Sequence, residues 1–244
     1  MLEGMYSAAA GMAAQQARID AVANDLANVS TTGYKHARVA FRDLTYTQAV
    51  RGAAPGVQTG AGAAATYIGR SDQQGPHIVT ERSLDVALRG PGYLQVRLPD
   101  GRIALTRDGA LKMDSRGRLG LATGELLWPT VRVPEGTNPE RISIADDGTV
   151  FAGNRRVGRV RIVEVPAPGA LAGGPNNTFL VTQASGPARA ARNTDLVQGA
   201  LEGSNVDMAT AMAQMIEGQR AFEMASRAIQ TQDQLLRIAN EVKR

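Results

Sequence analysis

Residues 5–29 read MYSAAAGMAAQQARIDAVANDLANV, a stretch in which a large apolar residue recurs at every seventh position. A second row with the same spacing runs near the other end of the chain. The two rows, which we call the assembly seam, consist of Met5, Met12, Ile19, Leu26, Met208, Met215, Phe222, Ile229 and Leu236. Apolar residues seven apart lie along one side of an α-helix and require a partner helix. The pattern therefore predicts two terminal helices that pair with each other or with other copies.

The expected helices span residues 2–29 and 206–242. Gly33 is suited to a left-handed cap after the first helix, and Ser204 or Asn205 is suited to the N-cap of the second. Small residues such as Gly218 accompany the large ones and favour close approach of the two helices.

The middle of the chain is rich in glycine, proline and short alternating segments, which are typical of β-strands. Turn pairs punctuate it at short intervals, and each is expected to place a glycine at positive φ. They are Asp100-Gly101, Asp108-Gly109, Arg116-Gly117, Thr123-Gly124 and Asp147-Gly148. Short strands are expected between these turns and after them, and one of them spans residues 157–165.

The predicted fold class is α+β, in which the N- and C-terminal helices pair as a coiled-coil-like layer beside a central antiparallel, hairpin-rich β domain. The boundaries follow from composition. Residues 1–33 form the N-terminal axial helix, 34–83 an extended or linker segment that is rich in Gly, Ala and Pro between 51 and 65, 84–200 the β domain, and 201–244 the C-terminal axial helix.

Composition argues against several classes of function. The 244-residue chain has no cysteine, so it has no disulfide, thiolate metal site or cysteine nucleophile. No run approaches the roughly 18 apolar residues of a membrane span, so no membrane insertion is expected. His36 and His77 are expected to be surface residues, and no phosphate loop, catalytic elbow or zinc motif is present. We therefore expect no catalytic residue, no cofactor and no metal.

The net charge is +4, and the one notable basic cluster comprises Arg155, Arg156, Arg159 and Arg161. No aromatic stacking residues accompany it, so a solvated strand-turn-strand surface is favoured over a nucleic-acid site.

Several stretches resemble the flagellar basal-body rod and hook family, the axial proteins of the bacterial flagellum. Residues 23–35, ANDLANVSTTGYK, resemble the family signature ANNLANxxTxGFK, with Asp25 and Tyr34 as mild departures. Residues 84–93, LDVALRGPGY, and 106–109, TRDG, resemble two central elements, and LEGSNVD at 201–207 with QRAFE at 219–223 resemble two C-terminal ones. The matching positions of the terminal motifs include Asn24, Leu26, Asn28, Gly33, Ser204, Asn205, Gln219 and Arg220.

The resemblance implies a structural subunit of the flagellar basal-body rod, located outside the cytoplasmic membrane and in the periplasm where the host has an outer membrane. It implies export through the flagellar type III apparatus and self-assembly into a helical tube that transmits torque. Other rod and hook subunits would be its partners, with no nucleic acid among them. Such contacts between copies are heterologous and do not close into a ring.

Two alternatives stay open at this point. The layout fits the distal rod subunit most closely, but the segment after Leu44 is shorter than the usual distal insertion, which leaves a proximal rod subunit as an alternative. A monomeric β-domain adaptor with a stalk of two paired helices would also explain the seams.

Overall fold

The structure is a computed structural model that describes residues 2–44, 47–48 and 58–242. The part of the expected linker at 51–57 lies outside the described residues. The chain divides into two compact units. Unit 1 comprises residues 1–27, 37–68 and 207–244, and unit 2 comprises residues 28–36 and 69–206. Because the chain passes between them several times, the units differ from the four consecutive segments expected from the sequence.

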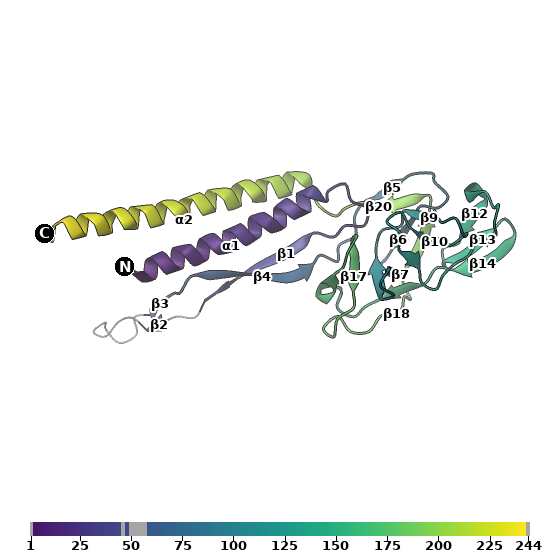
Figure 1. The fold of residues 1–244 in the computed structure, drawn as a ribbon, viewed down its shortest axis with the longest axis horizontal. Helices are drawn as coiled ribbons and strands as arrows, with labels where there is room; N and C mark the ends of the chain where they lie inside the picture. Colours follow the sequence, from purple (N-terminus) through teal and green to yellow (C-terminus); the bar gives the residue numbers. More distant parts are fainter. Residues whose placement is uncertain (1, 45–46, 49–57, 243–244) are drawn as a thin grey trace. The chain divides into compact units, whose positions relative to one another are not determined.

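Unit 1 contains the two long helices and a β-ribbon (Figure 1). Helix α1 spans Leu2–Ala27 and helix α2 spans Met208–Val242, and the two pack along each other. Strand β1 (Ala37–Asp43) pairs with β4 (Ala63–Arg70), the last two residues of which belong to unit 2. The short strands β2 (Thr47–Gln48) and β3 (Gln58–Thr59) form a further antiparallel pair.

Small residues bring the elements of unit 1 close together, as the sequence suggested. An added Cβ atom at Gly62 would lie 2.9 Å from the carbonyl oxygen of Ser7 in α1, and one at Gly218 would lie 2.9 Å from the Ile19 side chain. Both helices are shorter than expected. Because α2 begins at Met208, its N-cap is Asp207, whose Oδ1 accepts from the Thr210 N–H at 2.8 Å, and not Ser204 or Asn205. Since α1 ends at Ala27, Gly33 does not cap it and has another role, described below.

Unit 2 is built from antiparallel strands (Figure 1). Its main sheet has nine strands. Seven follow the order β16 (Ala172–Gly173), β17 (Thr178–Leu180), β8 (Ile103–Thr106), β7 (Tyr93–Arg97), β11 (Leu126–Leu127), β10 (Leu119–Leu121) and β9 (Leu111–Met113). Strand β15 (Ile162–Glu164) also pairs with β7, and β18 (Arg189–Ala190) pairs with β15.

Three smaller sheets complete unit 2. One has the order β12 (Ile142–Ile144), β13 (Thr149–Ala152) and β14 (Arg155–Arg159). The other two are pairs, β6 (Val86–Arg89) with β19 (Asp195–Gln198) and β5 (His77–Val79) with β20 (Ala200–Glu202). Two 3₁₀ turns span Pro139–Arg141 and Pro168–Ala170.

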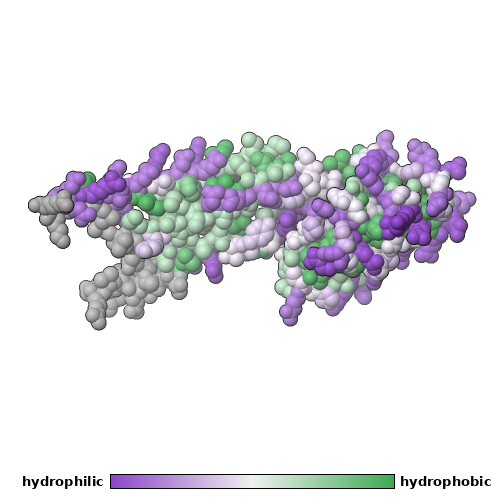
Figure 2. All heavy atoms as spheres, viewed as in Figure 1, coloured by the Kyte–Doolittle hydropathy of each residue, from purple (hydrophilic) through white to green (hydrophobic). Residues whose placement is uncertain are grey.

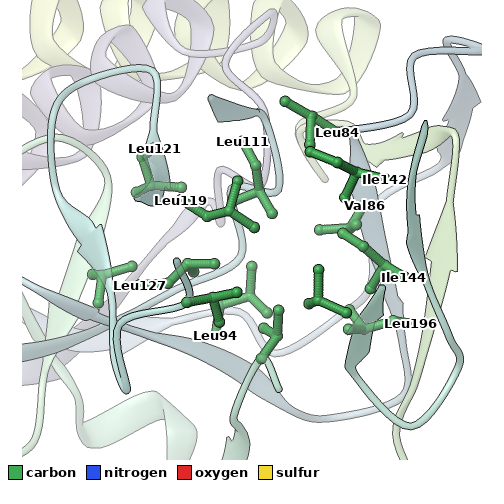
Figure 3. Packing of buried hydrophobic residues seen from close by; sticks show 14 of the residues in the cluster. Leu84, Val86, Leu94, Leu111, Leu119, Leu121, Leu127, Ile142, Ile144 and Leu196 are labelled. Atoms are coloured by element: carbon green, nitrogen blue, oxygen red, sulfur yellow. The ribbon is translucent and has the colours of Figure 1, made fainter. Parts of the chain in front are cut away.

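The core of unit 2 is aliphatic, as the low aromatic content predicts. Leucine, isoleucine and valine side chains from several strands converge in one cluster (Figure 3). Leu94, Leu111, Leu119 and Leu196 are completely buried within it. At about 1.5–3 kcal/mol per buried side chain, this cluster supplies the main driving force for folding of the unit.

Two expectations about unit 2 are wrong. The single strand expected at 157–165 is two strands, β14 and β15, that lie in different sheets. Gly101, Gly117, Gly124 and Gly148 have positive φ as predicted, but Gly109 does not. Glycine is required there for space, because a Cβ atom would lie 1.7 Å from the Val86 carbonyl oxygen.

Candidate functional site

Three of the segments that carry the family-like motifs meet inside unit 2. Residues 28–36 lie against the turn at 106–109 and against β20 and the residues that follow it. The contact depends on Gly33, which has φ +65° and whose N–H donates to the Glu202 carbonyl at 2.8 Å. A Cβ atom at this position would lie 2.4 Å from the Arg107 carbonyl carbon. Glycine therefore provides both the backbone conformation and the close approach.

A buried charge cluster holds the same three segments together. The Glu202 carboxylate accepts from Lys35 Nζ at 2.6 Å and from Arg107 Nη1 at 2.9 Å, one cation at each oxygen. The three side chains are at most 2% exposed. The Gly75 N–H donates to Glu202 at 3.1 Å, and Arg107 Nη2 donates to the Gly90 carbonyl at 2.8 Å. One buried carboxylate thus neutralises part of the charge of two buried cations.

Burial shifts the pKa values of two groups in the cluster. Loss of hydration lowers the pKa of Lys35, and the hydrogen bond and the charge of Glu202 oppose that effect. Lys35 also donates to the carbonyl of Gln73. Burial likewise raises the pKa of Tyr93, whose ring lies 5.0 Å from the Arg107 guanidinium. Lys35 therefore depends on Glu202 to remain charged at low energetic cost.

Further hydrogen bonds extend the contact on both sides of the cluster. Asn205 Oδ1 accepts from the His36 N–H at 2.8 Å, and its Nδ2 donates to the Gln73 carbonyl at 2.9 Å. On the other side, Thr32 Oγ1 donates to Asp108 Oδ1 at 2.7 Å, and Asn177 Nδ2 donates to the Thr32 carbonyl at 2.9 Å. Residues 28–36 are therefore fixed to unit 2 along most of their length.

Asp108 is buried rather than a solvated turn residue, and its environment makes stability depend on pH. Burial raises its pKa, and the nearby Asp85 and Glu125 add to the effect, whereas hydrogen bonds from Ala110 and Thr32 oppose it. A carboxyl whose pKa is higher in the folded state stabilises the fold below its ordinary pKa of 3.8, and this contribution is lost as the pH rises through the folded-state value.

We therefore expect the free energy of unfolding of Asp108→Asn to rise relative to that of the wild type as the pH increases from 3.5 to 7. Urea titrations followed by fluorescence of Trp128, the only tryptophan, would measure this in unit 2. Asp114→Asn is the matched control, because backbone and side-chain donation from Arg118 lowers the pKa of that surface carboxyl and gives the opposite slope. If the free energies of unfolding of the wild type and of Asp108→Asn change with pH in parallel, the raised pKa assigned to Asp108 is wrong.

The arrangement is suited to holding the three segments in place. Within the described part of the chain, no group of three or more histidine and carboxylate side chains could hold a metal ion. No described helix is long and apolar enough to cross a membrane. The charged side chains of the cluster are engaged with one another and with backbone carbonyls, which fixes their positions and shields them from solvent.

The assembly-seam residues lie in unit 1. Met5, Met12, Ile19 and Leu26 are half-buried along α1. In α2, Met215, Phe222 and Ile229 are half-buried, and Met208 is 51% exposed. The side chain of Leu236 lies outside the described residues.

The residues of the family-like motifs fall into two groups. Asn28, Gly33, Ser204 and Asn205 lie in the segments that meet in unit 2; Asn28 accepts from Thr31, and Ser204 is buried. Asn24, Leu26, Gln219 and Arg220 lie in unit 1, where all but Leu26 are exposed. The sequence did not single out Lys35, Arg107 and Glu202, although each lies inside a family-like motif. The signal that could have identified them is that each is a charged residue in a motif whose other residues are mostly polar, small or glycine.

Three family models match the chain. The model described as flagella basal body rod protein matches residues 5–35, the flagellar hook protein FlgE/F/G D1 domain matches 87–152, and the flagellar basal body rod FlgEFG protein C-terminal matches 197–242.

Similar proteins match over the whole length. The flagellar basal-body rod protein FlgG of Borreliella burgdorferi is 37% identical, with all of both chains covered. FlgG of Caulobacter vibrioides is 33% identical over 99% of this chain and 100% of its own. The flagellar hook-basal body complex protein FlhP of Bacillus subtilis is 31% identical over all of both chains.

Proposed function

The chain belongs to the flagellar basal-body rod protein family, and from that premise we propose that it is a distal rod subunit that assembles into a helical tube. The tube carries torque from the motor to the hook, outside the cytoplasmic membrane and in the periplasm where the host has an outer membrane. Full-length similarity to FlgG proteins of several bacteria, at 31–37% identity, supports this member of the family. A proximal rod subunit is the alternative within the family.

The observation that best supports self-assembly is a second apolar face on α2. One face packs on α1, and its members are alternately four and three residues apart. Its members are Ala211, Met215, Gly218, Phe222, Ala225 and Ile229, and all are buried or half-buried. The other face, which we call the outer stripe, is exposed. Its members are Met212, Ile216, Met224, Leu235 and Ile238, and they are 50–66% exposed.

The outer stripe distinguishes the two hypotheses, a subunit of a polymer and a monomeric adaptor. An adaptor with a stalk of two paired helices needs one apolar face on α2, because α1 covers it. A subunit packed between neighbouring copies needs two apolar faces on α2, because one contacts α1 and the other contacts a neighbour. Several exposed large apolar side chains on one helix are typical of an interaction site, and hydrophobic residues, in green, are visible on the surface of unit 1 in Figure 2. The stripe therefore favours assembly over the adaptor.

The partners follow from the same proposal. Copies of the chain contact one another through different surfaces, which generates an open helical array rather than a closed ring. Other rod and hook subunits would continue the array at its ends. Export through the flagellar type III apparatus would deliver the chain, and the absence of cysteine is compatible with assembly outside a reducing cytosol.

The role is mechanical, and we propose that the chain has no enzymatic activity. The family is structural, and the buried side chains of Lys35, Arg107 and Glu202 are paired with one another.

A single cysteine on the outer stripe tests the assembly directly, because the chain has none of its own. Ile216→Cys is expected to react with a maleimide at full rate in dilute protein and about tenfold more slowly after assembly, since burial excludes the reagent. Lys112→Cys, exposed on β9 in unit 2, reports the reactivity of an exposed thiol away from the helices. Unchanged reactivity of Cys at position 216 in sedimented assemblies would show that the stripe is not the contact.

A further inference from the structure

The basic cluster noted in the sequence lies on a continuous surface of unit 2. Strand β14 runs beside residues 129–135, with Gly158 packed against Val131. One end of this pair borders a hollow of about 480 Å³, which Arg159, Arg161 and Arg192 line. The other end borders a hollow of about 510 Å³, which Arg116, Arg132 and Arg155 line. We call the two hollows and β14 the arginine surface.

Most of these arginines have no carboxylate partner. Among the described residues, no carboxylate oxygen lies within 4.0 Å of the cationic groups of Arg116, Arg132, Arg155, Arg156, Arg161 or Arg192. All six are exposed. The two acids in the first hollow are already engaged, because Asp147 lies 3.7 Å from Arg159 and Asp195 lies 3.5 Å from Arg89. The surface therefore has unpaired positive charge at both ends.

We propose that the arginine surface binds an extended acidic segment of another protein. Guanidinium groups are planar and pair with carboxylates through two parallel hydrogen bonds, which makes carboxylates their natural protein ligands. The two hollows are separated by the length of β14, about 13 Å, so an extended chain reaches both whereas a small anion fills one.

The lining favours a protein segment over other polyanions. The residues that line the two hollows include no aromatic side chain, so neither offers a stacking platform for bases or sugar rings. Asp147, Asp195 and Glu135 also lie in the hollows, and a uniformly charged phosphate chain would pass close to all of them. A peptide can place carboxylates opposite the unpaired arginines and neutral residues opposite the acids.

The test uses the full chain and a fluorescein-labelled peptide of alternating glutamate and serine, long enough to span both hollows, with binding followed by fluorescence anisotropy. The peptide is expected to bind in a salt-sensitive manner, and Arg161→Glu/Arg192→Glu is expected to weaken binding at least about tenfold. The control Arg102→Glu/Lys112→Glu makes the same change in net charge at exposed sites of unit 2 outside the hollows and is expected to change binding less than about twofold. Trp128 fluorescence verifies that each variant is folded.

Three outcomes would overturn the proposal. Equal weakening by the two double variants would show that only the net charge matters. Tighter binding of inorganic polyphosphate than of the peptide would assign the surface to a phosphate polymer. Loss of self-association in Arg161→Glu/Arg192→Glu would assign it to a second copy of the chain. Each result leaves the outer stripe, and so the proposed rod assembly, to be judged separately.

Discussion

Replacing Glu202 with glutamine is expected to lower the free energy of unfolding of unit 2 by about 3–5 kcal/mol, because it leaves two buried cations without a counter-charge. The substitution keeps the size of the side chain and an acceptor for the Gly75 N–H. What it removes is the negative charge that Lys35 and Arg107 share at 2.6 and 2.9 Å. Urea unfolding followed by Trp128 fluorescence measures the loss.

The pH dependence identifies the cause of that loss. Since Glu202 opposes the lowering of the Lys35 pKa, its removal should lower that pKa further. A lysine whose pKa is lower in the folded state makes stability rise with pH between the folded value and 10.5. Glu202→Gln should therefore recover part of its lost stability as the pH is raised toward 10, and Lys35→Met/Glu202→Gln should recover part of it at pH 7.

Asp195→Asn is the matched control for Glu202→Gln. It removes the carboxylate of an exposed ion pair with Arg89 in the same unit, and such pairs contribute about 0–1 kcal/mol. If Glu202→Gln costs no more than Asp195→Asn, the cluster does not hold the three segments together.

Met212→Asp/Ile216→Asp is expected to abolish motility in a host that depends on this chain for its rod. Both side chains are about half exposed, so the charges should leave the chain folded as a monomer. In an assembly the same charges would be buried in an apolar contact in every copy, at a cost of several kcal/mol each. Complementation of motility, together with electron microscopy of isolated basal bodies, measures the effect.

The control for this variant adds the same charges elsewhere on the same helix. Thr210→Asp/Gln214→Asp alters exposed polar residues of α2 that belong neither to the face on α1 nor to the outer stripe, and it is expected to retain motility. Normal rods in Met212→Asp/Ile216→Asp, or an equal loss of motility in the control, would show that the outer stripe is not an assembly contact.

The terminal helices could be predicted from the sequence because their signal is local. Heptad spacing depends only on neighbouring residues, and it located both helices to within two residues at each end. The outer stripe escaped prediction for a related reason. Met212, Ile216 and Met224 fall outside the heptad rows, and only the packing of α1 on the opposite face shows that they are uncovered.

The charge cluster could not be predicted, because its members are far apart in the chain. Glu202 lies 167 residues from Lys35 and 95 residues from Arg107, and no periodicity links them. Gly109 shows a similar limit. The Asp-Gly pair predicted a turn with positive φ, but that glycine is required by the Val86 carbonyl of another strand, a contact that no local pattern encodes.

Sedimentation velocity over a concentration series, with circular dichroism on each sample, tests the central claim that this chain is a self-assembling rod subunit. We expect growth into large species as the concentration rises, with helicity that is retained or increased, and a monomer at every concentration for Met212→Asp/Ile216→Asp. A wild-type chain that stays monomeric at all concentrations, even when sheared preformed assemblies are added as seeds, would contradict the account and favour the monomeric adaptor.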